Sequence, residues 1–268
     1  MTENVMEHSN FVNTIKGAIG KKEGLYEESK ARYFVRSMYA GAMLVLATAC
    51  GVYAADYINV DAPHLGKFIY SFLFAFGLSF ILFLHQELAT SNMMYLTVGV
   101  YHRLIKPGKA TKILLFCTLG NFVGAVIAAW LIDNTGALSH LTAESFIVST
   151  VEGKLAKDLL QVFIEAIVAN IFVNIAILSY LMAKNEVAKL ILVFGAIFMF
   201  VFLGNEHVIA NFGSFSIVAL SNYTSEAIQF VPVLMAWIMA WIGNYVGGGL
   251  VMGLVYAWLN EDGLSLQD

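Results

Sequence analysis

The segment FLGNEHVIANFGSF, residues 202–215, places a carboxylate beside an imidazole in one of the most apolar regions of the chain. Glu206 and His207 follow an apolar run of 14 residues, 190–203, and no charged residue follows them until Glu226. A charged side chain within a membrane span costs about 2.5–3.5 kcal/mol even on insertion scales, so it is expected to face a cavity or a partner. Glu206 and His207 are therefore candidates for transport or proton chemistry.

A second segment of the same kind lies in the first half of the chain. FLHQELATSN, residues 83–92, shares the pattern F-L-x-x-E-x-x-x-x-N with FLGNEHVIAN, residues 202–211. Further along, LGNFVGA (119–125) matches IGNYVGG (242–248) in the same order. These matches predict two duplicated halves, about 37–150 and 151–260. With three spans in each half, the second copy must be inverted in the membrane.

The glutamates and asparagines of the repeated pattern are interpreted as structural. Glu87 and Glu206 occupy equivalent places, and each carboxylate is expected to accept N–H groups exposed where its helix breaks. Asn92 and Asn211 close the pattern in each half. His207 has no histidine counterpart, since Leu88 takes its place. A titratable group present in only one half is the better functional candidate.

The elements that must position these residues are membrane spans. The chain of 268 residues is 59% hydrophobic and 13% charged, whereas soluble domains are about a quarter charged. Uncharged windows long enough to cross a bilayer predict an all-α membrane protein with six transmembrane helices. The spans are expected at about 38–57, 68–101, 113–132, 159–182, 190–220 and 227–259. The second and fifth spans are predicted to break at 85–92 and 204–211. A broken helix is tolerated where it lines a cavity, and its N-terminal ends favour anions.

The distribution of basic residues predicts the topology. With six spans, 12 of the 15 lysines and arginines lie on the side of the N-terminus, and only Lys67, Lys154 and Lys157 lie on the other. Positive charge favours the cytoplasm, so both termini are expected there. Residues 1–36 form a cytoplasmic or interfacial segment, either a surface helix or a disordered tail. Residues 37–260 form the channel domain, and 261–268 a cytoplasmic tail.

The sequence lacks the motifs of the common enzyme and metal sites. No Walker loop, HExxH or G-x-S-x-G is present, and Cys50 and Cys117 form no CxxC pair. Adjacent residues on a helix diverge, so Glu206 and His207 would chelate a metal poorly. We expect no metal, no cofactor and no nucleic-acid partner. Asn170 and Asn174 are expected to hydrogen-bond between helices.

The repeated motifs resemble those of the formate/nitrite transporter family. GNEHVIANF resembles its E-H-[ST]-x-A-N signature, and ELATSN its [DE]-L-x-T-S element. GNFVGA, GNYVGGG and a fourth-span pattern ending at Asn170 match in order, so the resemblance covers about 35–260. It implies a homopentamer of aquaporin-like protomers in the lipid of a bacterial cytoplasmic membrane. Each protomer would have its own pore for a small monovalent anion or its conjugate acid.

The resemblance also assigns roles by position. It implies that Phe74, Leu78 and Phe200 form a constriction far from the cytoplasm, and that Leu88 and Thr90 lie in a loop of the second span that faces the lumen. It makes His207 the central histidine and Asn170 and Asn244 pore-associated asparagines. Lys154 would be a vestibule lysine that attracts anions. Three positions depart from the family pattern: Ala89 stands where many members have an aromatic residue, Asn205 replaces an aromatic or apolar residue, and Val208 replaces Ser or Thr.

The function that the resemblance implies is a pH-dependent channel or proton-coupled facilitator for formate or a close relative, and not an enzyme. Nitrite, lactate or acetate, and hydrosulfide are the alternative main substrates. Two rival classes remain. A membrane enzyme would use His207 as a general base but lacks a nucleophile or metal set. A receptor or scaffold would carry no flux.

Overall fold

The computed structural model describes residues 10–223 and 225–261, and within these ranges all regular structure is helical. Residues 1–9 of the predicted N-terminal segment and 262–268 of the predicted tail lie outside the described residues. The helices are α1 (Asn10–Glu28), α2 (Lys30–Asp61), α3 (Gly66–Phe74), α4 (Phe76–Phe83), α5 (Ala89–Tyr101), α6 (Pro107–Asn134), α7 (Phe146–Leu155), α8 (Leu159–Met182), α9 (Glu186–Leu203), α10 (Val208–Leu220), α11 (Phe230–Asn244), the π-helix η1 (Tyr245–Leu254) and α12 (Val255–Leu259).

The prediction of six membrane spans is confirmed. Among the described residues, six helical stretches are long and apolar enough to cross a membrane: 30–61, 66–83, 107–134, 159–182, 186–203 and 230–259. The first stretch begins earlier than expected, because the Ser29 hydroxyl accepts a hydrogen bond from the backbone N–H of Arg32 and caps α2. The chain is thus a multi-pass helical membrane protein.

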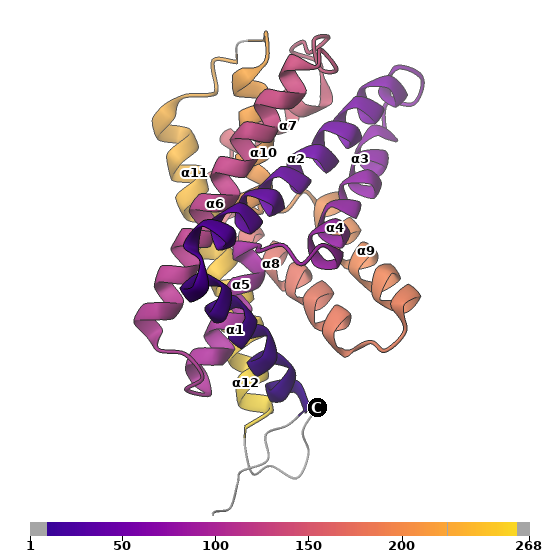
Figure 1. Cartoon of the computed structure of the whole chain (residues 1–268). Helices are drawn as coiled ribbons and strands as arrows, with labels where there is room; N and C mark the ends of the chain where they lie inside the picture. The colour runs from indigo at the N-terminus through magenta and orange to yellow at the C-terminus, as the bar shows by residue number, and fades with distance from the viewer. Residues whose placement is uncertain (1–9, 224, 262–268) are drawn as a thin grey trace, which may run out of the picture.

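The chain leaves helical geometry between α4 and α5 and again between α9 and α10. The first interval covers residues 84–88, and the second covers 204–207, where Gly204 ends α9 with a φ of 81°. Figure 1 shows α5 running from the middle of the molecule toward the end where α1 lies, and α10 toward the opposite end. The predicted inverted repeat requires this arrangement; the duplication itself stays a prediction.

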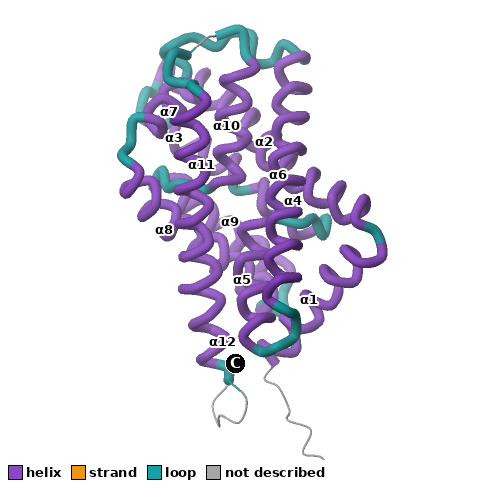
Figure 2. Tube along the Cα trace, turned by 90° about the vertical axis from the view of Figure 1, so that its left-hand side faces the viewer, coloured by secondary structure: helices purple, strands orange, loops and turns teal. Residues whose placement is uncertain are grey.

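The N-terminal segment forms a docked helix over residues 10–28. Phe11, Val12, Ile15 and Ile19 of α1 are buried, and the Phe11 ring centroid lies 6.0 Å from that of Tyr256 in α12. The alternative of a disordered tail is therefore wrong for this part of the segment. Both views place α1 and α12 at the same end of the molecule (Figures 1 and 2). The assignment of that end to the cytoplasm stays a prediction.

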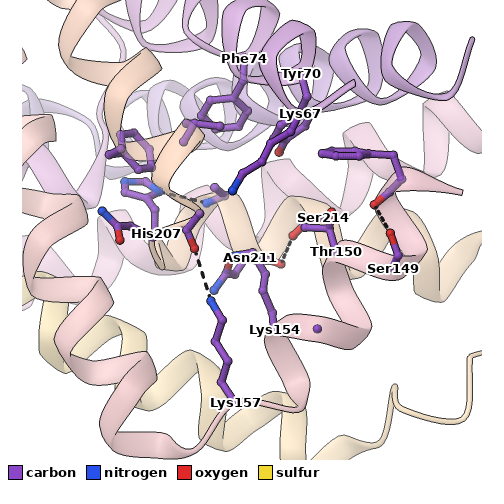
Figure 3. Close-up of a pocket in the computed structure, with 17 residues that line it drawn as sticks. Lys67, Tyr70, Phe74, Ser149, Thr150, Lys154, Lys157, His207, Asn211 and Ser214 are labelled. Atoms are coloured by element: carbon purple, nitrogen blue, oxygen red, sulfur yellow. Dashed lines mark hydrogen bonds between the residues drawn. The ribbon is translucent and has the colours of Figure 1, made fainter. Parts of the chain in front are cut away.

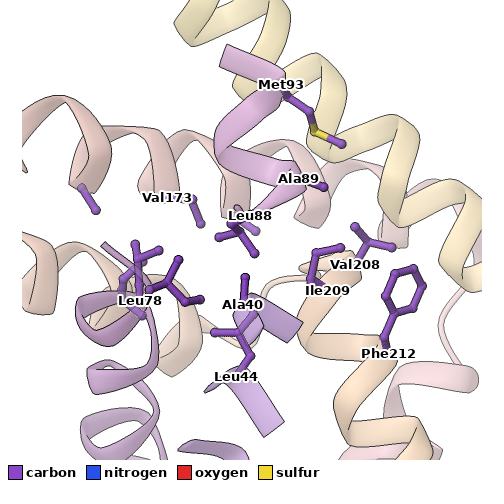
Figure 4. Packing of buried hydrophobic residues seen from close by; sticks show 14 of the residues in the cluster. Ala40, Leu44, Leu78, Leu88, Ala89, Met93, Val173, Val208, Ile209 and Phe212 are labelled. Carbon is purple, nitrogen blue, oxygen red and sulfur yellow. The ribbon is translucent and has the colours of Figure 1, made fainter. Parts of the chain in front are cut away.

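Close helix contacts hold each half together through glycines. A Cβ on Gly124 of α6 would overlap the backbone carbonyl of Met38 in α2, and one on Gly247 of η1 would overlap that of Ile167 in α8. Small residues let transmembrane helices approach backbone to backbone. The apolar side chains of Leu78, Leu88 and Ile209 are buried in the interior of the molecule (Figure 4).

We predict that Gly124→Ala destabilises the protein while Gly195→Ala does not. The added methyl at Gly124 must displace the α2 backbone, and overpacking of this kind costs about 1–3 kcal/mol. Gly195 in α9 has no atom within 4 Å of its would-be Cβ, so it is a matched helical control. Melting temperatures of the purified proteins in detergent test this. Equal melting temperatures for the two variants would contradict tight α2–α6 packing.

Candidate functional site

One asparagine of α6 supports the first interruption. The Asn121 side-chain oxygen accepts from the backbone N–H of Ala89, at 2.9 Å. Its amide nitrogen donates to the carbonyl of Glu87, at 2.8 Å, and to that of Ser37, at 2.7 Å. Unpaired backbone groups are costly at membrane depth. Asn121 therefore ties both sides of the break to α2 and α6.

Asn244 supports the second interruption with the same set of bonds. Its side-chain oxygen accepts from the N–H of Val208, at 2.8 Å. Its amide nitrogen donates to the carbonyls of Glu206, at 3.0 Å, and Ala166, at 2.8 Å. Asn244, which is expected to be pore-associated, is fully buried and bonds both sides of the break. The Gly-Asn pair repeated in LGNFVGA and IGNYVGG was the signal in the sequence for this role.

The two glutamates bind cations and side-chain amides instead of the backbone. Glu87 accepts from Lys22 of α1, at 2.9 Å, and from Asn92, at 3.0 Å. Glu206 accepts from Lys154 at 2.8 Å and from Asn211 at 2.6 Å. The expectation that these carboxylates accept the N–H groups of the breaks is wrong. Asparagine oxygens take those N–H groups, and a buried carboxylate is better matched by a lysine.

Glu206 has a second lysine partner that the sequence did not single out. Lys157, in the link between α7 and α8, donates to Glu206 at 2.7 Å and also pairs with Glu165. Burial acts to lower the pKa of Lys157, but the charges of Glu206 and Glu165 outweigh it and raise the pKa above its usual value. Lys157 therefore stays protonated at neutral pH.

His207 is held by one backbone donor and faces Thr90. It is the N-cap of α10, and its Nδ1 accepts from the backbone N–H of Ala210, at 3.1 Å. Since Nδ1 is an acceptor, this network assigns the proton of the neutral ring to Nε2. Nε2 lies 2.8 Å from the Thr90 hydroxyl oxygen. The ring then donates to Thr90, whose own hydroxyl hydrogen is left to donate elsewhere.

Apolar side chains enclose this polar pair. Phe74, Leu78, Leu88 and Phe200 are all at most 3% exposed. The ring centroids of Phe200 and His207 lie 5.8 Å apart, and those of Phe74 and Phe200 lie 6.3 Å apart. Of the residues that the resemblance assigned to the constriction and the lumen-facing loop, Phe200 and Thr90 thus lie beside His207, and Phe74 lies beside Phe200.

A cavity of about 350 Å³ extends from His207 toward the end of the molecule where α7 lies. We call it the outer cavity, after the predicted topology. Its lining includes Lys67, Lys154 and Lys157, and Figure 3 shows Lys67 and Lys157 entering it from opposite walls. Phe74 and Phe200 also line it. It therefore presents cations at its mouth and apolar rings at its inner end.

A second cavity, of about 810 Å³, lies at the opposite end, beside α1. Its lining includes Lys22, Glu87, Leu88 and Ser91. We call it the inner cavity. His207, Phe74 and Phe200 line the outer cavity, whereas Leu88 and Ser91, on either side of Thr90 in the sequence, line the inner cavity. The His207–Thr90 pair therefore lies between the two cavities.

Asn170 and Asn174 hold Thr90 in place. Asn170 donates to the carbonyl of Thr90 at 3.1 Å and to that of Asn244 at 2.7 Å. Asn174 donates to the carbonyl of Thr90 at 3.5 Å and, within its own helix, to the carbonyl of Asn170 at 2.8 Å. Both side chains are fully buried, and neither residue lines either cavity. They act as the interhelical hydrogen bonds that their spacing predicted.

The chain is similar to known transporters and channels in both sequence and fold. The family model described as formate/nitrite transporter matches residues 10–258. The uncharacterized transporter YwcJ of Bacillus subtilis (strain 168) is 27% identical, over 90% of this chain and 94% of that protein. A solved FNT family ion channel has a TM-score of 0.86 and 23% identity, covering 92% of this chain and 97% of the other. A pentameric formate channel with formate bound has a TM-score of 0.69 and 21% identity, covering 85% and 96%.

We predict that Glu206→Gln destabilises the protein much more than Glu186→Gln. The first change leaves two partly buried lysines without their common carboxylate, and removing one partner of a buried pair costs about 3–5 kcal/mol. Glu186 pairs with Lys189 while 67% exposed, and exposed pairs contribute about 0–1 kcal/mol. Thermal melting in detergent compares the two variants. Similar small losses would show that the Glu206 pairs do not support the fold.

Proposed function

Because the chain belongs to the formate/nitrite transporter family, we propose that it moves formate, or a closely related small monovalent anion with its proton, across the bacterial cytoplasmic membrane. Nitrite, lactate or acetate, and hydrosulfide are the alternative main substrates. The family consists of transporters and channels, not enzymes. This assignment sets aside the membrane-enzyme and scaffold alternatives.

The observation that carries the proposal is the buried His207–Thr90 pair at the inner end of a lysine-lined cavity. An anion drawn into the outer cavity must pass Phe74 and Phe200, where it loses most of its water. An isolated carboxylate in such surroundings tends to take up a proton. A weak acid can therefore cross in its neutral form, whereas chloride has no such route.

The hydrogen bonds of His207 favour a neutral donor over an imidazolium. An imidazolium carries a hydrogen on Nδ1, which would face the N–H of Ala210 and lose the bond that Nδ1 now accepts. The neutral ring keeps that bond and offers Nε2–H to Thr90 or to a substrate oxygen. We therefore infer that the proton that neutralises the anion comes from solvent in one of the two cavities, and not from His207. His207 and Thr90 then supply hydrogen bonds at the midpoint.

The other assigned residues complete the pathway. Phe74, Leu78 and Phe200 form the constriction on the outer side, Leu88 the one on the inner side, and Lys154 belongs to the outer vestibule. The pentameric formate channel of similar fold supports a homopentamer. Both termini are assigned to the cytoplasm, which agrees with the common end of α1 and α12. Exposed apolar side chains such as Phe72 and Phe83 would face lipid or a neighbouring protomer.

We predict that His207→Phe abolishes formate uptake and leaves the oligomer folded. Phenylalanine fills the same space without a hydrogen-bond donor. His140→Phe is the matched control, because His140 lies in the α6–α7 link beside Asp56 and does not line either cavity. Uptake into proteoliposomes and size-exclusion chromatography measure the two properties. His207→Asn, which keeps a hydrogen-bond donor, is expected to retain part of the formate flux and its rise with falling pH, because the neutralising proton comes from solvent.

A folded His207→Phe oligomer that carries formate at the wild-type rate and pH profile would reduce His207 to a structural cap. Loss of uptake in His140→Phe as well would trace the effect to the removal of any histidine, and not to the central position.

For the wild-type protein we predict that formate flux rises as external pH falls and that chloride passes poorly. The neutral acid becomes about tenfold more abundant for each unit of pH lost, as long as the pH stays above the carboxylic acid pKa of roughly 4. A panel of formate, nitrite, lactate, hydrosulfide and chloride in proteoliposomes at several external pH values measures this. Chloride flux equal to formate flux at every pH would contradict passage as the neutral acid.

A further inference from the structure

The three lysines of the outer cavity differ in how their charges are compensated. Lys154 and Lys157 both pair with Glu206, and Lys157 also pairs with Glu165. Lys67, in the first turn of α3, has no carboxylate within ion-pair distance in residues 10–223 and 225–261. Its Nζ lies 5.7 Å from the ring centroid of Phe202, a contact that leaves the charge uncompensated. Lys67 therefore supplies the net positive charge of this cavity.

The ammonium group of Lys67 lies against the turn that ends α9. Its Nζ is 3.6 Å from the point that a Cβ would occupy on Gly204. Gly204 adopts a left-handed conformation, with a φ of 81°, and the next residue, Asn205, lines the same cavity. The turn thus brings the backbone of α9 beside Lys67 and presents Asn205 at the same place.

Asn205 carries a buried donor without an acceptor. Its Nδ2 is inaccessible to solvent and has no hydrogen-bond partner in the described part of the chain. Buried amide groups are nearly always paired, so such a donor calls for a ligand. Lys67 offers three N–H donors and the Asn205 amide offers two, and neither nitrogen can accept. An anion with two oxygen acceptors matches this pair.

We propose that Lys67 and Asn205 form an anion-binding subsite in the outer cavity, which takes a small carboxylate or nitrite before the anion reaches His207. This inference rests on the proposed transport function. Lys154 contributes less to capture than its position suggests, because Glu206 offsets its charge. Asn205 stands where the family pattern has an aromatic or apolar residue, so the subsite is a property of this chain.

Formate influx into proteoliposomes, measured over a range of formate concentrations at low ionic strength, tests the subsite. In Lys67→Gln the half-saturating concentration should rise about two- to fivefold, the range for one exposed ion pair, while the maximal rate is unchanged. Asn205→Leu should raise it in the same direction. The double variant should raise it by less than the product of the two single effects. At high salt the effect of Lys67→Gln should shrink, because the attraction is screened.

Two further variants separate the subsite from general charge effects. Lys67→Arg should retain the wild-type concentration dependence. Lys184→Gln, which removes an exposed lysine between α8 and α9, should also leave it unchanged. A folded Lys67→Gln oligomer with the wild-type half-saturating concentration at low salt overturns the subsite. So does a Lys184→Gln effect as large as that of Lys67→Gln.

Failure of the transport function itself gives a different result, namely no influx of any tested anion through the wild-type protein. In that case the subsite is judged by binding alone. Titration of isotope-labelled formate into detergent-solubilised protein, followed by NMR line broadening, should show binding that Lys67→Gln and Asn205→Leu each weaken. Equal line broadening in the wild-type and both variant proteins overturns the inference.

Discussion

The centre of the structure depends on satisfying the backbone where it leaves helical geometry, between α4 and α5 and between α9 and α10. Asn121 and Asn244 do this from the neighbouring helices, each with one accepted and two donated bonds. The glycine before each asparagine makes the contact possible, because a Cβ on Gly120 or Gly243 would overlap the facing helix. Without these bonds, the N–H groups of Ala89 and Val208 would have no partner at a depth where water cannot replace one. The open loops that carry Leu88 and His207 exist because their ends are fixed in this way.

The buried carboxylates impose a second constraint, and the two halves meet it differently. Glu87 receives Lys22 from α1, a helix outside the predicted repeat, whereas Glu206 receives both Lys154 and Lys157. Each buried carboxylate therefore has its own lysine partner, because an unpaired buried charge would be strongly destabilising. The result is one compensating lysine at the inner cavity and two at the outer. The electrostatic difference between the two ends therefore follows from one lysine outside the predicted halves, Lys22, and two lysines within the second half, Lys154 and Lys157.

The sequence was sufficient for the spans, because length and apolarity are local signals. It singled out His207 by comparison of the two halves, where Leu88 takes the equivalent place, and the role of His207 stays a prediction. It misassigned the carboxylates, since Lys22 is 65 residues from Glu87 and Lys154 is 52 residues from Glu206, and no local pattern links such pairs. It did not decide whether residues 1–36 form a helix or a disordered tail. A helix such as α1 is stabilised mainly by the packing of its apolar face, and the sequence does not show that Tyr256 lies against that face. Asn244 matched a pore-associated position by resemblance, but only the three-dimensional contacts show that its side chain bonds the backbone of Val208, Glu206 and Ala166.

The bond from the Ala210 amide to the histidine ring has a consequence for energetics. In the proposed function, a side chain whose second nitrogen accepts a backbone hydrogen bond stores no proton between one passage and the next. Such a protein has no charged intermediate to reset and no internal step that distinguishes inward from outward movement. Net flow would then reverse whenever the gradient of the neutral acid reverses, and the concentrations on the two sides of the membrane would set its direction.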